Sequence, residues 1–391
     1  MDSACRLTVV ASARDIGAGQ VLAPVLANLV EVGTKVSAFL AHPANEIFDQ
    51  RGLPYQPVGS HLSLAELHKL AERIINDRHP DLVLVGTCLG PSLDKELTVS
   101  ARQFGIPTVG VLDHWWHLWQ RFVNLNGGPR WQYLPDRLAV MDEIARDRLL
   151  SQGCPPERLV IAGQPYLEEV AAAGPRMCGA GMRRALQVTE DVRLVVFALE
   201  SRGNDRTRRK WQWEHPTAEE MRRAVAMIRS ALRWVARKHG LSVVLILKEH
   251  PAEAADWLGV DLDEGLRTIL LAKCDPRSLM AAADAVAGMT SMFIFEAAAM
   301  GKPTLCLWPI RSRPNPVAEL RIVSLSFAHT QRQCRAFLEA CLWGGGSARR
   351  ECTSEQLPYA LLRQSVRVIA NQVLELALLS RRNKDGLSIK V

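Results

Sequence analysis

The stretch of sequence that decides the fold is residues 284–309, DAVAGMTSMFIFEAAAMGKPTLCLWP. A short apolar run ends at Gly288-Met289-Thr290-Ser291, a helix-forming run containing Glu296 follows, and Gly301-Lys302-Pro303 stops it before a second apolar run. Continuous apolar runs on either side of a helix are typical of parallel strands that are buried on both faces. The stretch therefore predicts a strand–helix–strand unit of an α/β fold.

The same alternation runs through most of the chain, with a break near its middle. Strands are predicted at 7–11, 35–40, 81–86, 108–113, 137–141 and 159–162, and again at 194–199, 242–248, 268–272, 285–288 and 304–308. Helices are predicted between them and in the tail. We therefore expect two Rossmann-like parallel-sheet domains facing across a cleft. Their predicted extents are 1–172 and 191–355, with a linker at 173–190. A C-terminal helix that packs at the domain junction, and a tail, are predicted at 356–391.

Composition narrows the class of protein. The 391 residues are 48% hydrophobic and 23% charged, which is ordinary for a soluble globular chain. No apolar run reaches the roughly 20 residues of a membrane span, and the first residues lack a basic leader, so a cytoplasmic location is expected. The nine cysteines form no CxxC pair, which argues against a disulfide framework and a structural zinc site.

The net charge of +7 fits more than one partner. It suits an anionic ligand such as a sugar nucleotide, an anionic membrane surface, or simply a solvated arginine-rich surface. No nucleic-acid-binding motif accompanies the charge, so a nucleic-acid partner is not expected. The two acids of VDLDEG at 260–265 are interpreted as a surface loop, and no metal site is predicted.

The second half carries a candidate anion site. Thr290 or Ser291 stands at the start of a helix, where unpaired N–H groups and the positive end of the dipole favour a phosphate. Glu296 follows at a distance that would let it accept hydrogen bonds from ribose hydroxyls. A plain hydroxyl cap and a surface acid are the alternatives. His250, in KEHP at the end of the strand 242–248, would donate to a phosphate oxygen.

KEHP followed by AVAGMTSMFIFEAAAMGKPTLCLWP resembles the nucleotide-sugar half of two-domain GT-B glycosyltransferases. The pattern is similar to bacterial sialyltransferases, polysialyltransferases and CDP-glycerol glycerophosphotransferases, and also to lipid A disaccharide synthase and UDP-N-acetylglucosamine 2-epimerase. The resemblance implies that His250, Thr290 and Ser291 contact donor phosphates and that Glu296 contacts the ribose. The resemblance also implies that the loop after strand 194–199 faces the donor. Ser201, Arg202 and Gly203 are therefore donor-binding candidates, with a plain β-turn as the alternative.

Two departures from the family pattern bear on the reaction. The second Glu of retaining enzymes would stand eight positions after Glu296, where this chain has Thr304, so an inverting reaction, or no transfer reaction, is favoured. The acidic-acidic-Gly motif of sialyltransferases is missing from the first half, which argues against a sialic acid donor.

The first half offers acid–base candidates. The loop Ser12–Gly19 lacks the G-x-G-x-x-G register, so no NAD or FAD and no other cofactor is expected. In the GT-B interpretation this loop binds the acceptor, and Asp15 is the candidate general base, with a plain N-cap as the alternative. Asp113 and His114, in the tryptophan-rich segment 113–122, are the second acid–base candidates, although that segment could also be a packing plug. The predicted acceptor-binding residues are Arg14, Gly17, Thr87 and Trp115.

These observations predict an inverting, metal-independent GT-B glycosyltransferase that uses a nucleotide-activated sugar in polysaccharide or glycoconjugate synthesis. Its catalytic candidates are Asp15, Asp113, His114 and His250. A glycan or lipid-linked acceptor, with peripheral contact at the inner face of a membrane, fits this interpretation. The alternatives are a UDP-N-acetylglucosamine 2-epimerase-like enzyme and a non-catalytic nucleotide-sugar-binding protein. The sequence leaves the sugar, the acceptor and the oligomeric state open.

Overall fold

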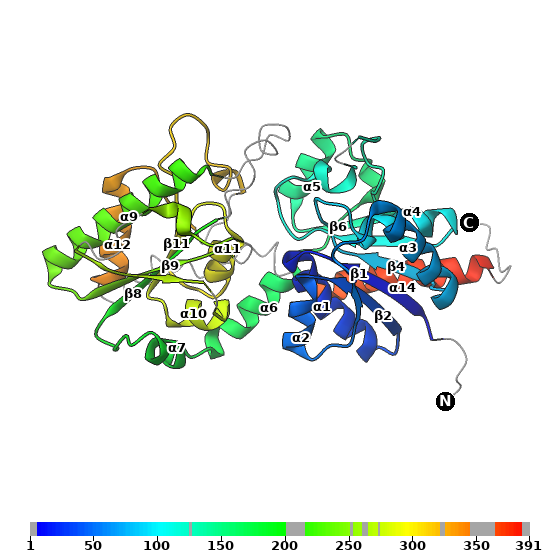
Figure 1. Ribbon diagram of the computed structural model, residues 1–391, viewed down its shortest axis with the longest axis horizontal. Coiled ribbons are helices and arrows are strands. Elements are labelled where there is room, and N and C mark those ends of the chain that lie inside the picture. The colour runs from blue at the N-terminus through cyan, green and yellow to red at the C-terminus, as the bar shows by residue number, and fades with distance from the viewer. Residues whose placement is uncertain are drawn as a thin grey trace. The chain divides into compact units, whose positions relative to one another are not determined.

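The chain folds into two α/β units, which Figure 1 shows as separate sheets with their own helices. The computed structural model describes residues 6–124, 127–200, 216–250, 253–259, 265–272, 274–320, 325–344 and 364–384. Unit 1 comprises Met1–Glu168 and Ala360–Val391, and unit 2 comprises Glu169–Tyr359. Every strand pair in both sheets is parallel, which confirms the predicted fold class.

Unit 1 contains a seven-stranded sheet with the order β3-β2-β1-β4-β5-β6-β7. Its strands are β1 (Thr8–Ala13), β2 (Lys35–Ala41), β3 (Gln56–Val58), β4 (Leu82–Val85), β5 (Thr108–Val111), β6 (Arg137–Val140) and β7 (Leu159–Ile161). The three central strands are almost wholly buried, as their continuous apolar runs predict. β5 ends at Val111 rather than at the predicted residue 113, so Asp113 stands in the loop beyond the strand.

Helices cover both faces of this sheet. One face carries α3 (Leu64–Arg78) and α4 (Leu93–Gln103), whose apolar residues share a core with β1, β2 and β4. The other face carries α1 (Ile16–Glu31) and α14 (Ser365–Lys384), which pack on each other and on central strands. The remaining helices of the unit are α2 (Ala44–Arg51) and α5 (Glu143–Ser151), and α6 (Pro165–Ala173) leads out of it.

Unit 2 contains a six-stranded sheet with the order β10-β9-β8-β11-β12-β13. Its strands are β8 (Arg193–Ala198), β9 (Val243–Lys248), β10 (Arg267–Leu271), β11 (Ala285–Gly288), β12 (Thr304–Leu307) and β13 (Ser326–Ala328). One face packs against α9 (Ala218–His239) and α12 (Gln331–Leu342), as Figure 1 shows. The helices α10 (Pro276–Ala282) and α11 (Met292–Ala299) also pack against the sheet, on β8 and on β11 and β12.

Both sheets reverse their strand order once, and this reversal positions the candidate site. In unit 1 it falls between β1 and β4, and in unit 2 between β8 and β11. The two strands of such a pair are parallel, but the connections that leave their carboxyl ends run toward opposite edges of the sheet. This opens a crevice beyond those carboxyl ends. Ligands of open parallel sheets bind there. Residues that follow these four strands, or the strands next to them, therefore lie where such sheets bind ligands.

The Gly-Lys-Pro stop after α11 has a structural explanation. Gly301 adopts a left-handed backbone with φ 73°, which suits glycine at the end of a helix. Lys302 extends its Nζ to the carbonyls of Ala281 and Ala283, at 2.7 and 3.1 Å. It thereby satisfies acceptors at the end of α10, which precedes α11 in the chain.

The segment 173–190 packs on unit 2. It contains a short 3₁₀ turn at Gly174–Arg176 and the helix α7 (Ala180–Ala185). Arg183 forms an ion pair of 2.7 Å with Asp284, which comes directly before β11. A Cβ on Gly179 would lie 2.3 Å from the backbone of Ala282, so the chain passes very close to α10 there. Among the described helices, none is both long and apolar enough to cross a membrane.

Candidate active site

Asp15 stands at the carboxyl edge of the unit 1 sheet, directly before α1. It holds the N-cap position with an extended backbone, yet its side chain makes no capping hydrogen bond. Burial raises the pKa of its carboxyl group, and the neighbouring charge of Asp113 raises it further, against the lowering effect of Arg121, Arg14 and Lys95. A carboxyl group with a raised pKa that is not used as a cap is a stronger base than an ordinary aspartate and is suited to accept and return a proton.

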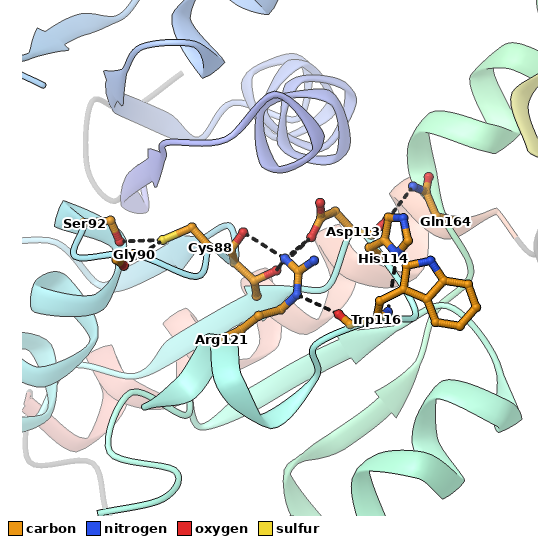
Figure 2. Close-up of polar contacts among 9 residues, drawn as sticks. Cys88, Gly90, Ser92, Asp113, His114, Trp116, Arg121 and Gln164 are labelled. Carbon is orange, nitrogen blue, oxygen red and sulfur yellow. Dashed lines mark hydrogen bonds and ion pairs between the residues drawn. The ribbon is translucent and has the colours of Figure 1, made fainter. Parts of the chain in front are cut away.

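Asp113 lies in the loop after β5 and is held by residues from two other segments. Thr87, which follows β4, donates its hydroxyl to Oδ1 at 2.9 Å, and Arg121 donates Nη1 to the same oxygen at 2.7 Å. Gln164 donates to the backbone carbonyl of Asp113 at 3.4 Å. Figure 2 shows the Arg121 guanidinium pointing at the Asp113 carboxylate. This fixes one oxygen of the acid by two donors.

The other oxygen of Asp113 lies against the first turn of α1. A Cβ built on Gly17 would approach Oδ2 to 2.2 Å, far inside van der Waals contact. Gly17 therefore leaves the room that lets the carboxylate reach the helix start. Asp15, Gly17, Thr87 and Asp113, which are separated by up to about a hundred residues in the sequence, thus form one cluster in unit 1.

Arg121 is the central cation of this cluster. It is buried, and besides Asp113 its Nη1 donates to the hydroxyl and the carbonyl oxygen of Thr87. Its Nε donates to the carbonyl of Trp116 at 3.3 Å. A guanidinium with several fixed hydrogen bonds retains its charge and its orientation. Arg121 lies within the tryptophan-rich segment 113–122 but is not among the site residues predicted from the sequence.

A second buried group lies beside the cluster. Ser12, within β1, donates its hydroxyl to Oδ1 of Asp94 at 2.6 Å, and burial raises the pKa of Asp94 to about 6. The second oxygen, Oδ2, is buried and has no hydrogen-bond partner in the described part of the chain. A small pocket with space for about one water molecule is lined by Asp94, Lys95, Thr87 and Arg121, among others.

Lys95 and Cys88 border the same pocket. Lys95 donates to the carbonyls of Leu89 and Val123 and lies over the ring of Tyr133, while burial lowers its pKa. Burial raises the pKa of the Cys88 thiol to about 12, so this cysteine is a neutral packing group. Asp94, Lys95 and Cys88 are not among the site residues predicted from the sequence. The only signal was an Asp-Lys pair at the start of a helix bordered by Gly90-Pro91.

The remaining predicted residues of unit 1 take different positions. Arg14 donates Nη1 to the carbonyl of Pro91 at 2.6 Å, and the absence of a side chain at Gly90 makes room for it. Trp115 is only 1% exposed and donates its indole N–H to Asp142. His114 is partly buried and accepts a hydrogen bond from the backbone N–H of Trp116. Trp115 therefore has the packing environment that was the alternative for this segment.

In unit 2, His250 lies two residues beyond the end of β9. Its carbonyl accepts the N–H of Glu253 at 3.1 Å, and the two residues form an isolated antiparallel bridge. Glu249 accepts the N–H of Ala255 at 2.6 Å, which closes the turn. These contacts keep His250 at the carboxyl edge of the sheet, as the KEHP motif predicts. Ser201, Arg202 and Gly203 lie outside the described residues.

The start of α11 is organised by two hydroxyls with separate partners. Ser291 is the N-cap and accepts the N–H of Phe293 at 3.3 Å. Thr290 instead donates both its N–H and its hydroxyl to the carboxylate of Glu200, at 2.5 Å each. Glu200 follows β8, so this contact spans the crevice between β8 and β11. The N–H and hydroxyl of Thr290 are thus already bound by an acid.

Glu296 is buried within α11 and lies near a cation that the sequence analysis did not select. Lys248, the last residue of β9, stands over the ring of Phe293 at 5.3 Å. Burial lowers the pKa of Lys248, whereas the charges of Cys274 and Glu296 raise it. A lysine at the carboxyl edge beside Glu296 adds positive charge to the predicted anion site. Among the described residues, no group of His, Cys, Asp and Glu side chains could hold a metal ion.

Comparison with known proteins shows the fold. Neither a protein-family model nor a curated protein matches the chain. A UDP-N-acetylglucosamine 2-epimerase from Neisseria meningitidis, solved with UDP-N-acetylglucosamine, superposes with a TM-score of 0.67 at 15% identity, over 94% of this chain and 100% of that one. A UDP-N-acetylglucosamine 2-epimerase from Methanocaldococcus jannaschii superposes with a TM-score of 0.65 at 12% identity, over 95% of this chain and 100% of that one. S. aureus MnaA, solved with UDP, superposes with a TM-score of 0.65 at 14% identity, over 95% of this chain and 97% of that one.

The two units therefore have the GT-B fold, which these proteins share. At identities this low the likeness extends to the fold alone. The matched structures give no support to the resemblance to sialyl-, polysialyl- and glycerophosphotransferases that the KEHP motif suggested.

Proposed function

We propose that the chain is a nucleotide-sugar enzyme that acts on a UDP-sugar by acid–base chemistry, in the manner of a 2-epimerase. Unit 2 supplies the nucleotide site, with Ser291 and the start of α11 for the diphosphate and Glu296 for the ribose. His250 serves as a hydrogen-bond donor to the phosphates and Lys248 as a nearby cation. Unit 1 supplies the groups that move protons. The similar structures that carry UDP or UDP-N-acetylglucosamine support the choice of ligand.

The observation that carries this proposal is the carboxylate cluster of Asp15 and Asp113. The raised pKa of Asp15 makes it an effective base and, once protonated, an effective acid. Asp113 is oriented by Thr87 and Arg121 and lies close enough to Asp15 to contribute to the raised pKa of that acid. The C–H bond at C2 of the sugar is not acidic by itself, so when its proton leaves, the electron pair must form a C1=C2 double bond while the C1–O bond to UDP breaks. A proton then returns to C2 from the opposite face as UDP adds back to C1. Two carboxyl groups suit these two proton transfers better than one.

Incubation of the protein with UDP-N-acetylglucosamine alone tests the proposal. An epimerase needs no second substrate, so we expect a new UDP-N-acetylhexosamine to form, detected by chromatography. Asp113→Asn retains the shape of the side chain but removes its charge, and we expect at least a hundredfold loss of turnover. No conversion by the wild-type protein, with binding of the nucleotide sugar intact, would contradict the proposal.

A second candidate is inverting glycosyl transfer. It is favoured by Thr304, which lies in β12 and gives its hydroxyl to the carbonyl of Lys302, so the position of the second acid of retaining enzymes carries no carboxylate. Asp15 would then deprotonate an acceptor hydroxyl. Conversion that appears only after addition of a glycan or lipid-linked acceptor would favour this candidate over the epimerase.

A further inference from the structure

Glu200 places a carboxylate at the point where the strand order of unit 2 reverses. It follows β8, and both of its oxygens accept hydrogen bonds from Thr290, which follows the neighbouring strand β11. Glu200 as a whole residue is only 6% exposed. Crevices of this kind are where open parallel sheets bind their ligands. An acid is thus fixed beside the helix start that the proposed function assigns to a diphosphate.

The electrostatic effect of Glu200 reaches residues other than Thr290. Burial raises the pKa of the Cys306 thiol, in β12, to about 12, and the negative charge of Glu200 adds to that rise. A thiol is affected in this way only when the acid is close and poorly screened by water. Both oxygens of Glu200 accept hydrogen bonds from Thr290, which fixes the carboxyl group in place. An anionic ligand at the start of α11 is therefore exposed to this charge.

We propose that Glu200 determines which ligand charge the nucleotide site accepts, and that it disfavours a free nucleoside diphosphate relative to a nucleotide sugar. The inference rests on the proposed function. The terminal phosphate of UDP loses a second proton with a pKa near 6, so UDP carries about one more negative charge at pH 7.5 than a UDP-sugar does. Repulsion from Glu200 acts most strongly on that extra charge, which weakens the binding of UDP and speeds its release.

Calorimetric titration of wild-type protein and Glu200→Gln with UDP and with UDP-N-acetylglucosamine at pH 7.5 tests this. The amide retains an acceptor oxygen for Thr290 but no charge. We expect the ratio of the Kd of UDP to the Kd of UDP-N-acetylglucosamine to fall about fivefold in the variant. A structural role alone would change both Kd values by the same factor, so an unchanged ratio overturns the inference.

Two further variants keep the test informative. Glu200→Asp retains the charge, so its ratio should stay near the wild-type value even where both ligands bind more weakly. Glu339→Gln removes a carboxylate of α12 that pairs with Lys238 and His239 at the end of α9, just before β9 begins. This pair is not at the carboxyl ends of the strands, so the ratio of the two Kd values should not change in this variant. A fall in either ratio equal to that of Glu200→Gln contradicts the inference.

If Glu200→Gln does not fold, Thr290→Val provides the opposite change. It removes the hydroxyl that donates to Glu200 and leaves the carboxylate charge less compensated, so the ratio should rise. A fall or no change overturns the inference. Failure of wild-type protein to bind either UDP ligand would instead overturn the proposed function itself, and this outcome is distinguishable from the others because it needs no variant.

Discussion

Gly17 owes its place in α1 to the acid that approaches it. Glycine in a helix ordinarily costs about 1 kcal/mol relative to alanine. Here the backbone conformation would accept alanine, but its Cβ would lie 2.2 Å from Oδ2 of Asp113. The missing side chain is therefore explained by the carboxylate cluster rather than by the helix.

Replacing Gly17 with Ala should disturb the cluster. We expect a loss of about 2 kcal/mol in the free energy of unfolding, because the new methyl group must displace Asp113 from Thr87 and Arg121. Turnover should fall by at least tenfold. Urea denaturation and activity assays measure the two effects.

Gly181→Ala is the matched control for this prediction. Gly181 lies in α7, and nothing stands within 4 Å of the Cβ that alanine would add. Its stability should stay the same or rise slightly. Equal stability losses in both variants would show that the close approach of Gly17 to Asp113 does not matter.

The raised pKa of Asp94 implies that the free energy of unfolding depends on pH. Its pKa in the folded protein is about 6, compared with an ordinary value of 3.8. Between about pH 4 and pH 6 the folded state therefore binds more protons than the unfolded state, so stability falls as pH rises through this window. The full effect above pH 6 is about 3 kcal/mol.

Asp94→Asn removes that titration while keeping an acceptor for Ser12. Relative to the wild-type protein, we expect the variant to gain stability steadily between pH 4 and pH 6.5 and to keep the gain above it. Urea denaturation at several pH values measures the difference. Parallel curves for the two proteins would show that the carboxyl group of Asp94 is not destabilised by burial.

A site residue could be predicted from the sequence when its position depends on the strand directly before it, and not when its position depends on contacts with distant parts of the chain. Asp15, Asp113 and His250 follow apolar runs that read clearly as strands, so their place at a sheet edge was foreseeable. Asp94 and Lys95 begin a helix whose charged residues look like a solvated face, and only tertiary packing buries them. The pairing of Glu200 with Thr290 spans 90 residues and depends on strand order, which local patterns do not reveal.

At the level of elements, the strand–helix–strand unit β11-α11-β12 matches its sequence pattern closely. The apolar runs fixed the strands to within a residue, and Ser291 proved to be the cap. Lys302 was read only as part of a helix stop. Its actual contacts are with the end of a different helix, α10, so the pattern located the break without revealing what holds it.

Lys302→Met tests the role of this contact. The variant retains the apolar stem but loses two charge-assisted hydrogen bonds to partly buried carbonyls, so we expect a destabilisation of about 2 kcal/mol. Lys238→Met is the control, because Lys238 is 47% exposed and its ion pair with Glu339 should contribute less than about 1 kcal/mol. Thermal unfolding compares them. Equal shifts in Tm would contradict a special role for Lys302.

At the level of the whole molecule, the C-terminal helix returns to the first unit. Ile369, Ala370, Val373 and Ala377 of α14 are buried, and the helix packs on α1, β4 and β5. Arg381 adds an ion pair of 2.8 Å with Asp81 and donates to the carbonyl of Arg6. The sequence predicted a helix here that packs at the domain junction, but helical periodicity alone does not indicate which surface such a helix covers.

Removal of residues 364–391 should therefore destabilise unit 1 selectively. We expect amide hydrogen exchange to accelerate in β1, β4 and β5, because truncation exposes apolar surface that α14 covers. The strands β8, β9 and β11 of unit 2 should keep their protection. Equal acceleration in both sheets would show that α14 is not specific to unit 1.

The central claim is that the carboxylates of unit 1 move a proton at the sugar of a bound UDP-sugar. Its most direct test is proton NMR of UDP-N-acetylglucosamine incubated with the protein in D₂O. We predict that the signal of the hydrogen at C2 is lost as deuterium replaces it, at a rate that falls at least a hundredfold in Asp15→Asn. A C2 signal that persists with wild-type protein under conditions where the nucleotide sugar is bound would contradict the claim.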